Sequence, residues 1–231
     1  MKTLGVIGGI GPESTIEYYR SLIAVYREQK PDGSYPSIIL NSIDLKKLMA
    51  LIAANELTET IEYLGEEIEK LARAGAGCGL VAANTPHIVF DELGRQSSIP
   101  LISIVEATCQ EAKALGLKKL GLFGTRFTMQ GRFYPDIFSR EGLTLSIPTQ
   151  DDQDYIHEKY FSELVHGIFL PETCEHLLAI VDRLKASAGI QGLILGGTEL
   201  PLILRQTSYE GIPFLDTTQI HVKAAVRYLL S

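Results

Sequence analysis

Two short polar segments follow apolar runs and carry side chains suited to binding or transforming a small molecule. The first is Ala83-Asn84-Thr85-Pro86-His87, and the second is Gly196-Gly197-Thr198-Glu199. The amide of Asn84 and the hydroxyls of Thr85 and Thr198 can hydrogen-bond a carboxylate or an ammonium group. A simpler alternative for the first segment is a helix N-cap followed by proline. Both segments are therefore candidate ligand-binding sites.

Two further segments could bind a ligand through glycines and hydroxyls. Gly8-Gly9-Ile10-Gly11-Pro12-Glu13-Ser14-Thr15 makes Gly9 a candidate binding residue, because glycines permit close backbone approach and a helix N-terminus favours an anion. The alternative is a tight turn between a strand and a helix. A dinucleotide fingerprint would need a third glycine at Ser14. Gly124-Thr125-Arg126-Phe127-Thr128 is the corresponding segment later in the chain, and it adds hydroxyls and a cation.

Short, continuously apolar runs alternate with longer amphipathic segments. Such runs are typical of strands buried on both faces of a parallel sheet, and the amphipathic segments are typical of helices. The expected strands are residues 4–8, 37–41, 79–83, 100–104, 119–124, 143–147, 192–196 and 213–216, and the expected helices include 57–74, 154–168 and 173–188. This alternation predicts an α/β fold with ligand chemistry at the carboxyl ends of the strands.

Three pairs of strand ends resemble one another in the same order along the chain. The segments beginning at Leu4 and Leu120 lie 116 positions apart, Ala83 and Gly197 lie 114 apart, and Ile99 and Ile212 lie 113 apart. The nearly constant spacing predicts an internal duplication into two pseudo-symmetric domains with parallel sheets and a ligand cleft between them. We expect a first domain of residues 1–104 plus about 211–231 and a second domain of residues 105–210.

Composition narrows the classes of function. The 231 residues are 45% hydrophobic and carry a formal net charge of −7, with dispersed Lys and Arg, so nucleic acid is not an expected partner. The three cysteines, Cys78, Cys109 and Cys174, indicate neither a disulfide framework nor a zinc site, and the five histidines form no metal motif. The apolar run at the N-terminus is too short for a signal or a membrane span. We expect a soluble, unprocessed, cytoplasmic protein with no metal.

The chain resembles the aspartate/glutamate racemase superfamily, in particular its aspartate racemase branch. The resemblance rests on the segments quoted above, together with Thr198-Glu199-Leu200-Pro201 and Asp216-Thr217-Thr218-Gln219-Ile220-His221. It implies two pseudo-symmetric α/β domains and racemisation of an acidic amino acid without a cofactor, usually by a homodimer. It also implies that Asn84, Thr85, Thr125 and Thr198 hold the α-carboxylate and amino group of the substrate.

The sequence departs from this family where the chemistry takes place. The family's reaction uses two proton carriers on opposite faces of the α-carbon, usually cysteines, and here Ala83 and Gly197 stand at both positions. The titratable side chains nearby, which are weak substitutes, are Glu13, His87 and Glu199. Candidates for binding a second carboxylate are Lys47, Arg126 and Lys159.

Three functions follow from these observations. The first is an isomerase with atypical acid and base groups, and the second is a non-catalytic binder of a small acidic amino acid or related carboxylate. The loss of both thiols favours the binder, and restoring them as Ala83→Cys plus Gly197→Cys is predicted to create measurable α-proton exchange. A dinucleotide-dependent oxidoreductase is the third and rests only on the glycine-rich turn.

Overall fold

In the computed structural model, which describes residues 2–231, the chain divides into two compact units. Unit 1 comprises residues 2–103 together with His221–Ser231, and unit 2 is Ile104–Ile220. The last helix begins in unit 2, and from His221 onward its residues belong to unit 1.

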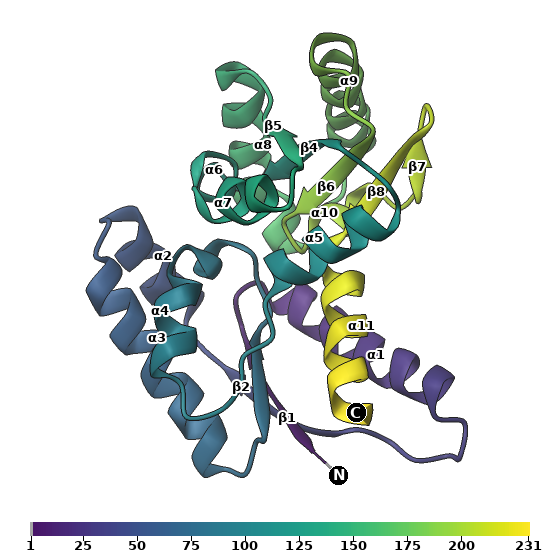
Figure 1. The fold of residues 1–231 in the computed structure, drawn as a ribbon. Helices are drawn as coiled ribbons and strands as arrows, with labels where there is room; N and C mark the ends of the chain where they lie inside the picture. The colour runs from purple at the N-terminus through teal and green to yellow at the C-terminus, as the bar shows by residue number, and fades with distance from the viewer. Residues whose placement is uncertain (1) are drawn as a thin grey trace. The chain divides into compact units, whose positions relative to one another are not determined.

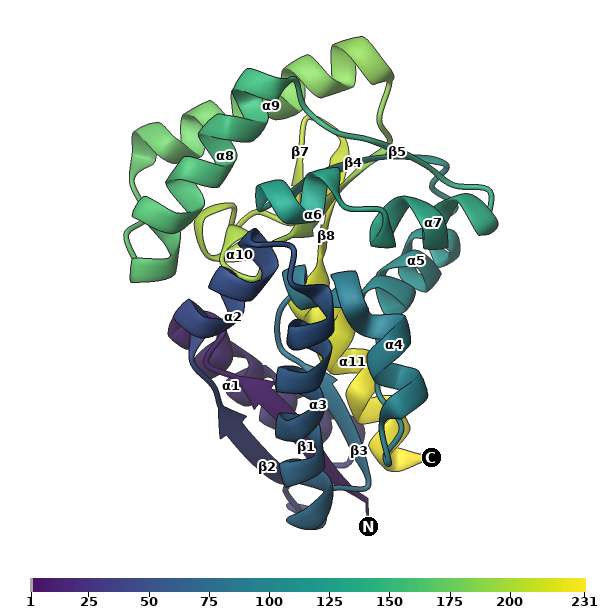
Figure 2. The same ribbon diagram turned by 90° about the vertical axis from the view of Figure 1, so that its left-hand side faces the viewer.

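Unit 1 contains a three-stranded parallel sheet in the order β2-β1-β3. Helices α1 and α11 lie on one face of this sheet and α3 lies on the other (Figures 1 and 2). The elements are β1 (Thr3–Gly8), α1 (Pro12–Gln29), β2 (Ser37–Ser42), α2 (Leu45–Ala53), α3 (Leu57–Arg73), β3 (Cys78–Val81), the 3₁₀ helix η1 (Thr85–Val89), α4 (Phe90–Gln96) and α11 (Thr217–Leu230).

The core of unit 1 follows from the alternation of side chains along β1. Leu4 and Val6 belong to a buried cluster with Tyr18 and Leu22 of α1 and several apolar residues of α11. Gly5 lies between them on the other side of the strand, where an added Cβ would meet side-chain atoms of Leu71 of α3 at 3.0 Å. A glycine on this face therefore lets α3 pack closely against the sheet.

Unit 2 contains a five-stranded sheet in the order β5-β4-β6-β8-β7. Its first four strands are parallel and the short β7 runs antiparallel to β8. The elements are α5 (Ile104–Ala114), β4 (Lys119–Gly124), α6 (Arg126–Gln130), α7 (Phe133–Arg140), β5 (Thr144–Ser146), α8 (Gln150–Ser162), the 3₁₀ helix η2 (Leu164–His166), α9 (Pro171–Ala188), β6 (Gly192–Gly196), α10 (Leu200–Ile203), β7 (Ser208–Tyr209) and β8 (Ile212–Asp216).

A hydrophobic cluster in unit 2 joins its sheet to α8 and α9. Phe123 of β4 and Leu195 of β6 pack in one cluster with Ile156 and Tyr160 of α8 and Ile180 of α9. The strand orders β2-β1-β3 and β5-β4-β6 correspond, with the first strand of each unit in the middle of its set. The α/β class and its parallel strands are as the sequence predicts.

Two features differ from the sequence-based expectations. Residues 100–104 do not form a full strand: Leu101 makes a single parallel bridge with Gly79, and α5 begins at Ile104. Pro100 lacks an N–H to donate to a longer ladder. The expected domain boundary near residue 211 also differs, because β8 pairs with β6 and the chain remains in unit 2 up to Ile220.

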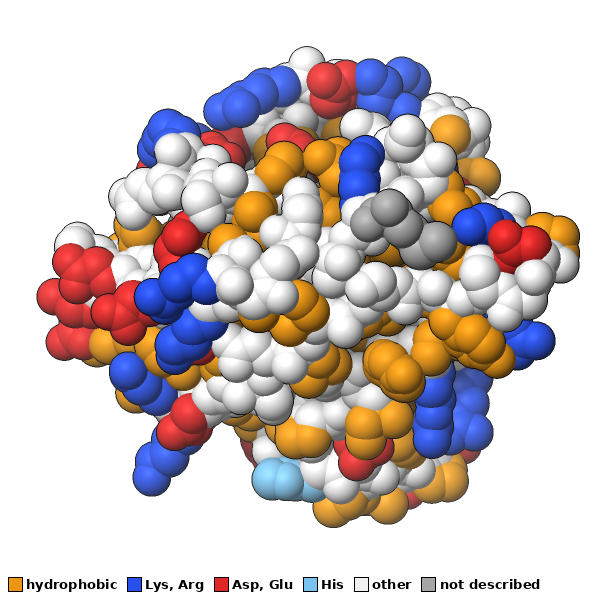
Figure 3. All heavy atoms as spheres, turned by 90° about the horizontal axis from the view of Figure 1, so that it is seen from below, with side chains coloured by type: hydrophobic (Ala, Val, Ile, Leu, Met, Phe, Trp, Pro, Cys, Tyr) orange, Lys and Arg blue, Asp and Glu red, His pale blue; other side chains and the backbone are white. Residues whose placement is uncertain are grey.

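The distribution of charge and the hydrophobicity of the helices were compared with what a nucleic acid or a membrane would require. On the face shown in Figure 3, Lys and Arg side chains are scattered among acidic and hydrophobic ones and do not gather in one basic patch. Among the described residues, no helix has both the length and the apolar character needed to cross a membrane.

Candidate functional site

The turn after β1 is built around glycines that no other residue could replace without strain. Gly9 has φ +79°, and a Cβ there would lie 2.5 Å from the carbonyl oxygen of Ile43. Its N–H donates to Oγ1 of Thr15 at 2.9 Å, and the same hydroxyl donates to the carbonyl of Gly11. The Thr15 side chain in the first turn of α1 thus bridges the turn, and it already accepts the N–H of Gly9.

The segment after β3 buries its polar side chains. Ala83, Asn84 and Thr85 are all at most 6% exposed, and Asn84 stands at the N-cap position of η1. Its carbonyl accepts the N–H of His87 at 2.9 Å, whereas its side chain makes no capping bond to this helix. Asn84 and Thr85 are thus buried polar residues that directly follow β3, and the Asn84 side chain does not cap η1.

Beneath this segment lies a buried pair of histidines. Nε2 of His221 contacts the carbonyl of Ile102 at 2.8 Å, and its Nδ1 contacts the hydroxyl of Tyr18 at 3.0 Å. Because a carbonyl only accepts, Nε2 carries the proton and Nδ1 accepts from Tyr18. His87 directs Nδ1 at the carbonyl of Ala83, 3.0 Å away, and stacks on Phe90. Both imidazoles therefore have structural partners.

Burial strongly disfavours charge on both rings. Desolvation lowers the pKa of His87 from 6.5 to about 3, with a smaller contribution from nearby His221. Desolvation likewise lowers the pKa of His221 to about 4. Both rings are neutral at physiological pH, so His87 does not act there as a proton donor from an imidazolium.

In unit 2, the segment after β4 contains a threonine whose hydroxyl caps the N-terminus of α6. Oγ1 of Thr125 accepts the N–H of Thr128 at 3.3 Å and so caps α6. The two hydroxyls also lie 3.3 Å apart, and both residues are buried. At Gly124 a Cβ would meet the Gly196 carbonyl at 2.7 Å, so this glycine permits close approach of β4 and β6.

The segment after β6 forms a buried cluster of oxygen atoms. The hydroxyl of Tyr160 donates to Oε2 of Glu199, and Oγ1 of Thr198 donates to the same oxygen at 2.9 Å. Glu199 is 1% exposed and Tyr160 is 7% exposed. Burial, followed by the nearby Glu199 carboxylate, raises the pKa of Tyr160 well above its usual range. The phenol is therefore protonated and serves as a hydrogen-bond donor.

Gly197, which precedes this cluster, faces the ring of Tyr160. A Cβ at position 197 would lie 2.5 Å from Cε2 of Tyr160 and 3.1 Å from both Cζ and the hydroxyl oxygen. Sequence reasoning missed Tyr160. Its position four residues after Ile156 on α8 indicates a buried helix face, but nothing in the spacing indicates that the ring reaches Gly197.

The three candidate cations each have a partner within their own unit. Lys47 lies over the ring of Tyr63, 4.0 Å from its centroid. Lys159 pairs with Glu163 at 2.6 Å. Nη2 of Arg126 pairs with Oδ1 of Asp154 at 2.7 Å. Lys47 lies on α2, Arg126 begins α6 and Lys159 lies on α8.

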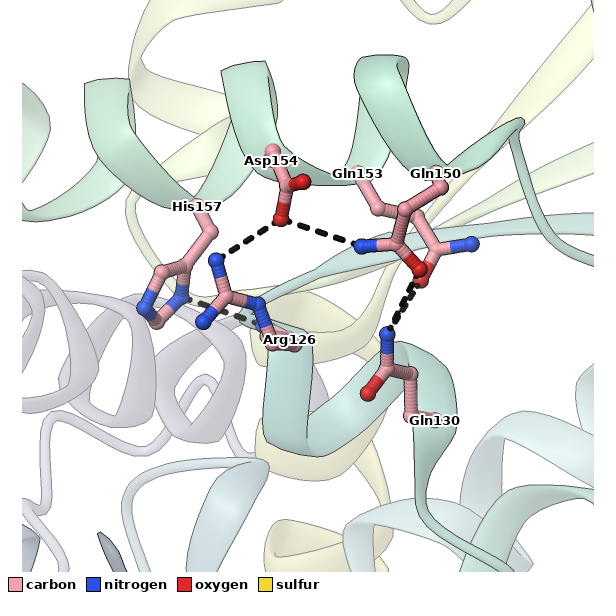
Figure 4. A network of polar contacts seen from close by, with 6 residues as sticks. All are labelled: Arg126, Gln130, Gln150, Gln153, Asp154 and His157. Carbon is pink, nitrogen blue, oxygen red and sulfur yellow. Dashed lines mark hydrogen bonds and ion pairs between the residues drawn. The ribbon is translucent and has the colours of Figure 1, made fainter.

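Arg126 belongs to a surface network between α6 and α8 (Figure 4). Its backbone N–H donates to Nδ1 of His157, and Gln150 donates to the same carboxylate oxygen of Asp154 as Arg126 does. These two hydrogen bonds, from Gln150 and then from Arg126, lower the pKa of Asp154. Arg126 directly follows Thr125, and its guanidinium remains nearly half exposed.

The remaining titratable candidates lie elsewhere. Glu13 is exposed in the first turn of α1. Cys78 begins β3, and Cys109 and Cys174 lie inside α5 and α9, with burial raising the pKa of each thiol. Within residues 2–231, no group of three His, Cys, Asp or Glu side chains is placed to hold a metal ion.

Comparison with known proteins identifies the family. The family model described as Asp/Glu/Hydantoin racemase matches residues 7–225. The fold is similar to that of a candidate Asp/Glu racemase from Yersinia pestis, with a TM-score of 0.89 and 33% identity over the whole of both chains. An aspartate racemase homologue from Pyrococcus horikoshii OT3 gives a TM-score of 0.83 and 32% identity, also over the whole of both chains.

A curated relative agrees with these matches. The broad specificity amino-acid racemase RacX of Bacillus subtilis (strain 168) is 24% identical over 238 residues, covering 99% of this chain and 98% of that protein. The family match over nearly the whole chain and the two solved structures above 30% identity lead to the same conclusion. The chain belongs to the Asp/Glu/hydantoin racemase family.

Proposed function

We propose that this protein binds a small acidic amino acid through the polar groups that follow β3 and β6, and that it does not run the two-thiol racemase reaction. An amino-acid racemase of this family removes the proton from the α-carbon of its substrate and returns a proton to the opposite face. Racemisation of that kind needs one group that removes the α-proton and another that delivers one to the opposite face.

The observation that carries this proposal is the pair Ala83 and Gly197. A methyl group and a hydrogen atom cannot exchange protons, whereas the neighbouring Asn84, Thr85 and Thr198 remain buried and polar. No cysteine replaces them: Cys78 starts the strand that leads to Ala83 and lies five residues away, roughly 16 Å along an extended chain. The groups for recognition are thus retained and the proton carriers are lost.

The substitutes near the site do not favour catalysis. His87 has its Nδ1 at the Ala83 carbonyl and a pKa of about 3, and Glu199 accepts bonds from Tyr160 and Thr198. A general base acts best when its pKa lies near the working pH. The pKa of His87 is far below that range, which supports a binding function over an isomerase with atypical groups.

Arg126 supports an acidic ligand. Its guanidinium follows Thr125 and is held by one exposed carboxylate, Asp154, which a ligand carboxylate can replace at little cost. Arginine binds carboxylates through two parallel N–H groups, so Arg126 is the proposed partner of the ligand's second carboxylate. Lys159 is less available, because the Glu163 that holds it is largely buried.

Calorimetric titration with L-aspartate, L-glutamate, L-alanine and succinate tests this function. We expect binding of the acidic amino acids, weakened by Asn84→Ala and by Thr198→Val. A matched control is Ser187→Ala, which changes a hydroxyl bonded to its own helix at Arg183 and should leave binding unchanged. Equal failure of all four compounds to bind would refute the proposal. Stabilisation by a nicotinamide dinucleotide instead would support an oxidoreductase.

The homodimer implied by the family resemblance is part of this proposal. Sedimentation equilibrium with and without L-aspartate is expected to give twice the mass of the chain, 25.4 kDa. A monomer that still binds L-aspartate would remove the dimer from the proposal.

A further inference from the structure

The space beside Gly197 is filled by the ring of Tyr160. A Cβ at residue 197 would approach Cε2 of that ring to 2.5 Å, a distance that Cβ atoms do not adopt in folded proteins. The Gly197 backbone has no positive φ, so the obstacle to a side chain here is the ring and not the backbone. Residue 197 and Tyr160 therefore compete for one volume.

Tyr160 is fixed in this volume from two sides. Its ring belongs to the buried cluster that joins α8 to β4 and β6, and it contacts the ring of Phe161 edge-on. Its hydroxyl donates to Glu199, which also accepts from Thr198. Moving the ring aside would open a gap in close-packed surroundings and break a buried hydrogen bond.

We propose that Tyr160 closes the proton-carrier position of unit 2, so that a thiol placed at residue 197 cannot reach the ligand while the ring is present. This inference rests on the proposed function, because it assumes that the ligand meets the segment after β6. Tyr160 is thus a positioning residue. Its ring occupies the volume that a proton-carrying side chain at residue 197 would need, and its hydroxyl is held by Glu199.

Contrary to the expectation from the sequence, restoring the two thiols is then not sufficient for α-proton exchange. In Ala83→Cys plus Gly197→Cys, the new side chain at residue 197 meets the ring at once. Removing the ring should allow the thiol to take its family position. One thiolate would then remove the α-proton to leave a carbanion, and the opposite thiol would deliver a deuteron acquired from D₂O.

The test compares three variants that all contain Ala83→Cys and Gly197→Cys. The first has no further change, the second adds Tyr160→Phe and the third adds Tyr160→Leu. Phenylalanine keeps Cε2 and Cζ, which make the contact, and removes only the hydroxyl. Leucine lacks these ring atoms and remains apolar within the cluster. The readout is loss of the α-proton NMR signal of L-aspartate in D₂O.

We expect exchange in the leucine variant to be at least tenfold faster than in the other two. A purely structural role for Tyr160 predicts no gain from removing it. Equal exchange in the double variant and the leucine variant would overturn the proposal. The proposal also fails if the leucine variant binds L-aspartate by calorimetry and exchanges no faster than the phenylalanine variant.

A stability cycle tests the contact without any ligand. Gly197→Ala is made in the wild-type chain and in Tyr160→Leu, and the melting temperatures are compared. We expect most of the loss caused by Gly197→Ala to disappear in the leucine background. If the wild-type protein does not bind L-aspartate by calorimetry, the proposed function fails. The melting-temperature comparison then still tests the contact between residue 197 and Tyr160. If Gly197→Ala lowers the melting temperature as much in Tyr160→Leu as in the wild type, the proposed role of Tyr160 is overturned.

Discussion

Adding a single methyl group at Gly197 tests the packing between β6 and α8. The Cβ of Gly197→Ala would lie 2.5 Å from Cε2 of Tyr160, and the ring cannot turn away without disturbing Glu199 and the surrounding cluster. Overpacking of this kind destabilises by about 1–3 kcal/mol. For a chain of this length, this corresponds to a fall in melting temperature of about 2–12 °C.

A matched glycine-to-alanine substitution elsewhere should raise the free energy of unfolding instead of lowering it. Gly65 lies inside α3, and a Cβ there would have no heavy atom within 4 Å. Gly65→Ala therefore gains helix propensity without a clash and should stabilise by about 0.5–1 kcal/mol. Calorimetric melting and urea unfolding at pH 7.5 measure both variants. A Gly197→Ala variant that unfolds within about 0.5 kcal/mol of wild type would refute the reasoning, since that is the range of uneventful surface substitutions.

Three other predictions follow from the two units. Because the pKa values of His87 and His221 lie at about 3 and 4, below 6.5 in the unfolded chain, the unfolded state binds more protons as the pH falls. The free energy of unfolding should then drop by about 2 kcal/mol per histidine between pH 7.5 and pH 5, and a flat urea-unfolding profile over this range would contradict it. Thr125→Val removes the cap of α6 and should cost about 1 kcal/mol, whereas Thr125→Ser should not; equal midpoints in urea would exclude the cap. Arg126→Gln should weaken L-aspartate binding about ten- to hundredfold and leave L-alanine unchanged, and Asp154→Asn should tighten it, by calorimetry; equal effects on both ligands would remove Arg126 from recognition.

The fold class could be predicted because hydrophobic patterning encodes which face of an element is buried. The run at Leu4 to Gly8 is continuous, as expected for a strand covered on both faces, and α1 and α3 do cover it. The same pattern says nothing about which strand is the neighbour. The expectation that the end of the chain completes the first domain from about residue 211 assigns residues 212–216 to that domain, but backbone pairing with β6 keeps them in unit 2.

The candidate site shows the same limit. Asn84, Thr85, Thr125 and Thr198 could be chosen from the sequence because each follows a strand, and parallel strands present their carboxyl ends on one edge. The partner of Gly197 could not be chosen, because Tyr160 lies on another element and meets it only through tertiary packing. Periodicity places Tyr160 on a buried face of α8 without saying what that face touches.

The proposed function has two parts: the protein binds an acidic amino acid, and it does not exchange the α-proton of that ligand. Proton NMR of L-aspartate in D₂O with the wild-type protein tests both parts in one sample, through saturation transfer from protein to ligand and through the area of the α-proton signal. We predict clear saturation transfer and an α-proton signal that stays constant over days. Steady loss of that signal, or the absence of saturation transfer, would contradict the proposal.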